Sequence, residues 1–414
     1  MNVEREVSSL GSIIDYVEQV PESFSERPFN EVDSLVLCEL VYQNFTGLAP
    51  GPGEGFVPFE KLSGDQAVEQ LVYQGRVPDL DSRLIRAVAA SPRYRGLQVG
   101  EFVNDIRKEE ESQFCGVTFL FPEFAYIAFR GTDTSYVAWK ENFNMAFLDR
   151  VPSQEQGLDY VDRVGGVLHC PLRIGGHSKG GNIAVYASMY CREEIRQRIR
   201  AIYSHDGPGF STAVLESPEY QQAQGLVLKT IPQSSFIGML LDRGEPCRVI
   251  RSNQFWILQH DPFSWVVENG EFRSAENLSS GARFVDNSFN YWIDNLTPDE
   301  LSLFSDAVYR VLRAFPGDDF NDLPDKWWQT VFETLSGLRG IDKGTYFHIL
   351  RAFASMITLA LKSIPKSIPR PSWAWVAARL PEGFARQVPF LRRELEGTDD
   401  SSEEESEEKG ESHP

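Results

Sequence analysis

One short segment of this 414-residue chain constrains its fold more than any other. Residues 172–182 read Leu-Arg-Ile-Gly-Gly-His-Ser-Lys-Gly-Gly-Asn: a short apolar strand, a serine between glycines, and the start of a helical pattern. A sharp strand-to-helix turn at Ser178 requires small residues two positions before and after it, and Gly176 and Gly180 meet that demand. The helix would point its partly positive N-terminus at the serine. The segment therefore predicts a nucleophilic serine at the edge of a sheet.

Short apolar strands alternate with helical stretches on both sides of this segment. Two buried strands joined by a tight turn are expected at residues 116–121 and 124–129. Further strand-like runs and two helical patterns follow, the strands at 172–175, 199–204, 225–231 and 247–251 and the helices at 156–167 and 181–191. This alternation favours an α/β fold with a mostly parallel central sheet.

Helical patterns dominate both ends of the chain. Residues 1–100 are expected to form an N-terminal helical extension, 101–295 the α/β core, 296–395 a C-terminal helical region, and 396–414 a disordered acidic tail. The stretch 353–361 is apolar nearly all round. A helix buried against the domain is favoured there over a lid above an acyl pocket or a helix resting on a membrane surface.

Charge and composition exclude several classes of protein. The net charge is −20, and residues 394–414 hold ten acidic residues and one lysine, so the remaining chain carries −11. An acidic body argues against sequence-independent binding of nucleic acid. The six histidines lack metal-site spacing, and no metal or organic cofactor is implied.

The cysteines and the apolar runs bear on the compartment. Five cysteines without a CxxC pair predict buried free thiols rather than a disulfide framework. The first residues lack the basic and apolar regions of a signal peptide, and no apolar run reaches the length of about 18 residues that a spanning helix needs. We expect a cytoplasmic enzyme, whose oligomeric state the sequence does not decide.

Two motifs resemble a known family. Residues 126–133, Tyr-Ile-Ala-Phe-Arg-Gly-Thr-Asp, with Trp139 after them, resemble the "AFRGT…W" segment of fungal-type class 3 lipases, and the GHSKGG at the serine is similar to their GHSLGG. Residues 30–33, 204–209 and 259–265 look like an uncharacterised bacterial branch of that superfamily. The resemblance implies an α/β-hydrolase fold, with N- and C-terminal helical additions here, and a hydrolase of unsettled substrate. It also implies that Thr132 and the amide of Lys179 form the oxyanion hole.

A serine nucleophile needs a base, and His260 is the leading candidate. The expected order in this fold is serine, acid, histidine, and His260 follows the last strand-like run. His205 is the rival, although it follows an earlier strand. His177 lies beside the serine and is expected to face away from it.

The acid departs from the lipase pattern. The loop 232–236, in which those lipases place an aspartate, has no carboxylate. Asp206, at the end of the preceding strand-like run, is the first choice, and Asp242 and Asp261 are the alternatives. The side chain of Lys179 stands where the lipases have leucine; a solvated head group is favoured over recognition of an anion.

The leading hypothesis is a serine hydrolase that acts on carboxylic esters, lipid-like acyl esters among them, through Ser178, His260 and Asp206. A non-catalytic binding or scaffold protein is the alternative from another class. A thioesterase or peptidase with the same machinery is a third.

Overall fold

The computed structural model describes residues 11–72, 77–107, 112–132, 145, 150–235, 237–239, 244–254, 256–275 and 278. The chain divides into two compact units, and all described residues belong to the first, which comprises residues 1–305 and 318–321. The C-terminal helical region and the acidic tail predicted from the sequence lie outside the described residues.

A single eight-stranded sheet holds the strands β1 to β8 in sequence order. The first four pair antiparallel, namely β1 (Phe56–Pro58), β2 (Gln98–Arg107), β3 (Ser112–Leu120) and β4 (Ala125–Phe129). The next four extend from β4 in parallel, namely β5 (Leu172–His177), β6 (Ile199–His205), β7 (Val227–Pro232) and β8 (Cys247–Ile250). This is the α/β-hydrolase fold with a mostly parallel central sheet, as predicted.

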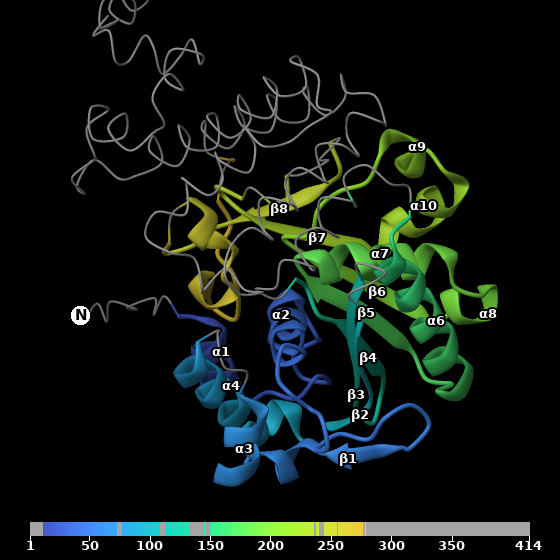
Figure 1. Ribbon diagram of the computed structural model, residues 1–414. Helices are drawn as coiled ribbons and strands as arrows, with labels where there is room; N and C mark the ends of the chain where they lie inside the picture. The colour runs from blue at the N-terminus through green and yellow to red at the C-terminus, as the bar shows by residue number, and fades with distance from the viewer. Residues whose placement is uncertain are drawn as a thin grey trace, which may run out of the picture. The chain divides into compact units, whose positions relative to one another are not determined.

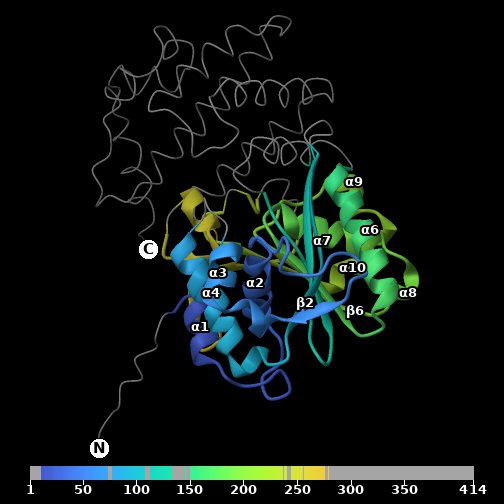
Figure 2. The same ribbon diagram turned by 60° about the horizontal axis from the view of Figure 1, so that its bottom comes forward.

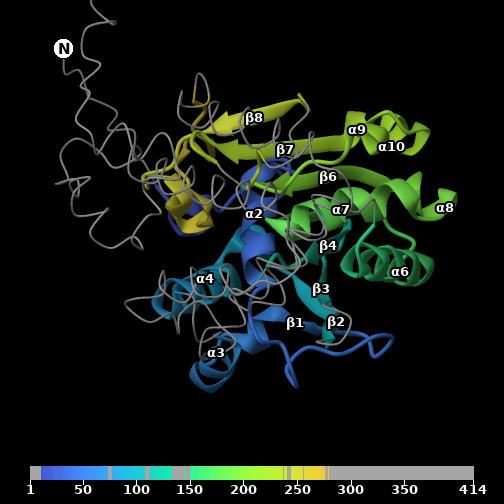
Figure 3. The same ribbon diagram turned by 45° about the horizontal axis from the view of Figure 1, so that its top comes forward.

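Helices cover both faces of the sheet (Figures 1 and 2). One layer contains α1 (Ile13–Gln19), α2 (Glu31–Leu40), α3 (Asp65–Leu71) and α4 (Pro78–Ala90). The other contains α6 (Pro152–Val167), α7 (Lys179–Tyr190), α8 (Glu193–Arg196), α9 (Thr212–Leu215) and α10 (Pro218–Ala223). Figure 3 shows α2 and α7 on opposite sides of the sheet. None of the helices in the described part is long and apolar enough to cross a membrane.

Short elements complete the unit. They are the 3-10 helices η1 (Phe59–Leu62), η2 (Pro92–Tyr94), η3 (Gln224–Leu226), η4 (Trp256–His260) and η5 (Pro262–Ser264), and the hairpin of β9 (Val267–Glu268) and β10 (Glu271–Phe272). All five cysteines are free, and Cys38, Cys115 and Cys191 are buried.

Strand β4 shows why the sequences of the central strands are continuous apolar runs. Tyr126 and Ala128 pack in the core beneath α1, α2 and α4. Ala125, Ile127 and Phe129 pack in a second core beneath α6 and α7. Successive side chains of a strand point to opposite faces, so a strand covered on both sides needs apolar residues at every position.

A buried ion pair anchors the N-terminal layer. Asn30 caps α2 by accepting from the amide of Asp33, whose carboxylate accepts in turn from the Asn30 amide. The Asp33 carboxylate binds the Nε and Nη2 of Arg93 at 2.7 and 2.6 Å, and both side chains are fully buried. The hydroxyls of Tyr16 and Tyr94 also donate to Asp33. A buried carboxylate with this many donors is well compensated, so α1, α2 and η2 are held together at one point.

Candidate active site

The candidate residues meet at one edge of the sheet, where the parallel strands end. Thr132 follows β4, Ser178 follows β5, and Asp206 follows β6. His260 ends η4, in the segment that follows β8. Ligand and catalytic sites of parallel α/β sheets form at the carboxyl ends of the strands, so the topology gathers these residues at the expected edge.

Ser178 has an unfavourable backbone conformation. Its φ and ψ are 58° and −132°, and it stands between β5 and the first residue of α7. A side chain with a Cβ at such angles costs of order 1–3 kcal/mol, which the surroundings must offset. The Ser178 amide donates to the carbonyl of His205 at 2.9 Å, and the Ser178 carbonyl accepts from Gly181 at 2.9 Å. These two hydrogen bonds, to His205 and from Gly181, therefore hold the strained turn in place.

The flanking glycines are needed because backbones touch at the turn. A Cβ on Gly176 would collide with the backbone of Gly180. A Cβ on Gly180 would collide with the carbonyl oxygen of Phe129, the last residue of β4. The turn can close only without side chains at these two positions.

His260 and Asp206 form a pair at this edge. The Nδ1 of His260 lies 2.6 Å from the Oδ2 of Asp206. The aspartate side chain is fully buried, while 26% of the histidine side chain is exposed. The buried carboxylate thus orients an imidazole that keeps access to solvent. Within the described residues, no hydrogen bond joins the Ser178 hydroxyl to His260.

The rival residues have other contacts. His205 is fully buried, its Nε2 lies 2.8 Å from the Ser34 hydroxyl, and its Nδ1 has no partner among the described residues. Burial lowers the pKa of His205 to about 3. Asp261 caps η5 by accepting from the amide of Phe263. Asp242 lies outside the described residues.

Tyr42, just beyond the end of α2, touches the backbone around the serine. Its hydroxyl lies 3.2 Å from the Nδ1 of His177 and accepts from the amide of Gly131 at 3.2 Å. The ring of His177 is centred 4.4 Å from that of His260, so the expectation that His177 faces away from the site is wrong. No motif marked Tyr42, because its role depends on where α2 packs against the sheet.

The side chain of Thr132 has unused hydrogen-bonding capacity. Its Oγ1 is buried and has no partner among the described residues. The preceding residue passes close to Ser178, because a Cβ on Gly131 would lie 2.9 Å from the Cβ of that serine. The hydroxyl of Thr132 can therefore bind a group that enters beside the serine. Asp133 and Trp139 of the same motif lie outside the described residues.

The side chain of Lys179 is not solvated, contrary to the sequence prediction. It is fully buried, and its Nζ donates to the carbonyl of Gln113 at 2.6 Å. Gln113 lies at the start of β3, so the lysine ties the N-terminus of α7 to the sheet. The sequence showed a cation in a first helical turn, but only the packing of α7 decides whether that turn meets water.

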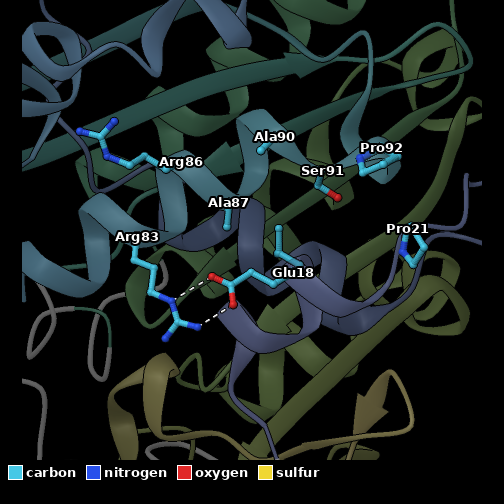
Figure 4. Close-up of a pocket in the computed structure, with 9 residues that line it drawn as sticks. Glu18, Pro21, Arg83, Arg86, Ala87, Ala90, Ser91 and Pro92 are labelled. Carbon is cyan, nitrogen blue, oxygen red and sulfur yellow. Dashed lines mark hydrogen bonds and ion pairs between the residues drawn. The ribbon is translucent and has the colours of Figure 1, made fainter.

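A groove of about 580 Å³ lies elsewhere, in the N-terminal layer between α1 and α4 (Figure 4). Arg83, one of its two arginines, donates from Nε and Nη2 to the carboxylate of Glu18 at 2.9 and 2.6 Å. None of its lining residues is a candidate site residue, and no group of His, Cys, Asp or Glu in the described part could hold a metal ion.

The model of the Mbeg1-like family matches residues 88–310, more than half of the chain. M37 lipase is 13% identical, with a TM-score of 0.32, and the match covers 41% of this chain and 65% of that lipase. The chain therefore spans slightly less than two thirds of that protein.

Two fungal enzymes are also similar. The lipase of Rhizopus microsporus var. chinensis is 16% identical with a TM-score of 0.31, and the match covers 48% of this chain and 72% of that one. The Lip2 lipase of Yarrowia lipolytica is 13% identical with a TM-score of 0.32, over 62% of this chain and 90% of that one. No curated protein matches the chain.

Substituting Gly180 by alanine should destabilise the protein, because the added methyl group meets the Phe129 carbonyl. We expect the free energy of unfolding to fall by about 1–3 kcal/mol, the usual cost of overpacking. Gly225→Ala is the control, since no atom lies within 4 Å of a Cβ there. Urea denaturation of both variants would measure the difference, and equal stability would contradict the close packing of the turn.

His205 should make stability depend on pH. Burial lowers its pKa from 6.5 to about 3, so between these values the unfolded chain binds a proton that the folded chain excludes. Its contribution is complete above pH 6.5 and falls by about 1.4 kcal/mol per pH unit below it. From pH 7 to pH 5, the wild type should therefore lose about 2 kcal/mol more than His205→Gln. Equal losses in chemical denaturation at the two pH values would rule out a buried neutral histidine.

Proposed function

This chain belongs to the Mbeg1-like family, and we propose that it is a serine hydrolase that acts on carboxylic esters, lipid-like acyl esters included. The observation that carries the proposal is the pair of His260 and the buried Asp206, 2.6 Å apart, at the sheet edge where Ser178 has a strained backbone. A nucleophile, a base and an acid gathered at one edge of the sheet are suited to acyl transfer.

His260 is better suited than His205 to act as the base. A general base must keep one ring nitrogen for the nucleophile's proton while the other is held in place. In His260, Nδ1 is held by Asp206, which leaves Nε2 for the serine. The Nε2 of His205 is engaged by Ser34, and burial lowers the pKa of His205 to about 3, so it is a poor proton acceptor.

The absence of a hydrogen bond between Ser178 and His260 is compatible with this role. Hydrogen bonds between catalytic groups are often long in ligand-free structures and shorten when substrate binds. The exposed part of the His260 side chain leaves it room to reorient, while the Asp206 contact keeps one end of the ring fixed.

The oxyanion would be held by Thr132 and by the amide of Lys179. The buried Oγ1 of Thr132 has no partner in the described residues and is free to donate to a new oxygen. Lys179 is the first residue of α7, so its amide lies at the partly positive end of a helix. The Gly131 amide donates to the Tyr42 hydroxyl instead of to the oxyanion, and this contact fixes the chain just before Thr132.

The proposed reaction has two halves. The Ser178 hydroxyl attacks the ester carbonyl carbon and its proton passes to His260, while the negative charge forms on the carbonyl oxygen. His260 then protonates the departing alcohol, which leaves an acyl group on Ser178. Water, deprotonated by His260, attacks that acyl group, and the proton returns to Ser178 as the carboxylic acid is released. Asp206 stabilises the imidazolium in each half of the cycle.

Wild-type protein should react covalently with a fluorophosphonate probe at Ser178. Ser178→Ala should show no labelling, and its kcat for a short p-nitrophenyl ester should fall by a factor on the order of 10⁶, as in other serine hydrolases without their nucleophile. Labelling of the alanine variant at the wild-type level would exclude Ser178. A folded wild type that neither reacts nor turns over a panel of esters, thioesters and peptides would favour a non-catalytic binding protein.

The acid can be assigned with two asparagine variants. Asp206→Asn should lower kcat by about 10⁴-fold, because the histidine loses the charge that orients it. Asp261→Asn is the matched control: it changes the carboxylate next to His260, and asparagine caps a helical turn as well as aspartate does. If the larger loss occurred in Asp261→Asn, the assignment to Asp206 would be wrong.

Removing the Tyr42 hydroxyl should slow the reaction without weakening substrate binding. Tyr42→Phe leaves the buried Gly131 amide unpaired, so we expect kcat to fall by about tenfold, equivalent to about 1.4 kcal/mol, with little change in KM. Tyr186→Phe is the control. It removes a hydroxyl of α7 that donates to Glu155 of α6, in the helical layer opposite that of Tyr42. An unchanged kcat in Tyr42→Phe would argue against a role in holding the oxyanion segment.

A further inference from the structure

The turn after β7 holds the acid, although it contains no acid itself. The loop 232–236 is where the lipase pattern places its aspartate, and this chain has serines there. The Ser235 hydroxyl donates to the Oδ1 of Asp206, while the Oδ2 accepts from His260. Each carboxylate oxygen thus has its own donor, and the two donors come from different segments.

The direction of the Ser235 hydrogen bond follows from its other contact. The amide of Gly238 donates to the Ser235 oxygen at 2.9 Å. An amide can only donate and an ionised carboxylate can only accept, so the hydroxyl proton must point at Asp206. Accepting from Gly238 also polarises the hydroxyl and makes it a better donor.

The same turn also contacts the segment that carries the base. The Ser234 amide donates to the Oε1 of Gln259 at 2.8 Å, and Gln259 directly precedes His260. The Gln233 amide donates to the carbonyl of Ile250, the last residue of β8, at 3.0 Å. The turn therefore contacts both Asp206 and the segment that carries His260, and so fixes one relative to the other.

Gly238 packs against the Asp206 carboxylate beside Ser235. A Cβ at this position would collide with the Oδ1 of Asp206 and would lie 3.0 Å from the Ser235 oxygen. The backbone consequently packs directly on the carboxylate, and the aspartate is fully buried. A carboxylate confined in this way cannot rotate to another partner.

We propose that Ser235 is a positioning residue of the catalytic machinery: it holds the Asp206 carboxylate in the orientation that His260 requires, so that Asp206 can act in place of a carboxylate on the β7 turn. This inference rests on the proposed function. Ser235 touches neither substrate nor the reacting atoms, and acts only through Asp206.

The test is a double-mutant cycle in the full chain, with p-nitrophenyl ester turnover and the rate of fluorophosphonate labelling as readouts. Ser235→Ala should lower kcat and the labelling rate by about 10- to 100-fold, as expected for a lost hydrogen bond to a charged group, with KM changed less than about twofold. In an Asp206→Asn background the same substitution should cost less than about twofold, because the group it acts through is gone.

Two further variants separate positioning from stability. Ser235→Thr keeps the hydroxyl and should recover most of the lost kcat. Ser188→Ala removes another buried hydroxyl, one that donates to the Ala184 carbonyl in α7, and should leave kcat unchanged. Melting curves of all variants would show that each is folded.

The possible failures are distinct. An active wild type with an equally active Ser235→Ala would overturn this inference alone, and so would a loss of equal size in both backgrounds. A wild type that is neither labelled nor active would overturn the proposed function, and the positioning role with it.

Discussion

The site depends on one constraint, which is the closeness of three backbones around Ser178. Strand β5 turns into α7 with the serine at a φ of 58°, and glycines let the turn touch itself and the end of β4. The Ser178 amide is bound to the carbonyl of His205, the last residue of β6. The strained conformation of Ser178 persists because its contacts with the ends of β4 and β6 leave no room for a relaxed one. Everything else at this edge is positioned relative to that turn.

The N-terminal layer contributes directly to the site as well as to the core. Along α2 and just beyond it, Ser34, Cys38 and Tyr42 are spaced by four residues and so lie on one face of the helix. Ser34 contacts Tyr126 and His205, and Cys38 contacts Tyr126. Tyr42 reaches His177 and Gly131 at the active-site edge. A buried row of polar groups on one face of α2 and just beyond it thus connects the ends of β4, β5 and β6.

Asp206, the proposed acid, occupies a different strand end from the acid of the lipase pattern. Asp206 lies at the end of β6, one strand nearer to the serine than the loop in which the lipase pattern places it. Its φ of 51° and its amide contact with Thr230 turn the carboxylate towards the next strand. Since the carboxylate need only meet the Nδ1 of His260, either strand end can supply it if the remaining turn offers donors in place of charge.

Local patterns were sufficient for much of the fold. The central strands, α6, α7 and the turn at Ser178 could be predicted because each depends on residues a few positions apart: apolar alternation, helix spacing, and glycines where Cβ atoms would collide. Strand β2 was missed, because it is polar along its outer half and contains a bulge at Glu101, so it shows neither pattern.

Other features could be decided only by the tertiary structure. The contact of Asp206 with His260, the burial of Lys179, and the contacts of Tyr42 and Ser235 all join segments distant in the chain. Such contacts are set by strand order, register and helix packing, which no short window of residues encodes. Residue types and near-neighbour spacing therefore determined which groups this protein has for chemistry, and the packing of distant segments decided which of those groups meet.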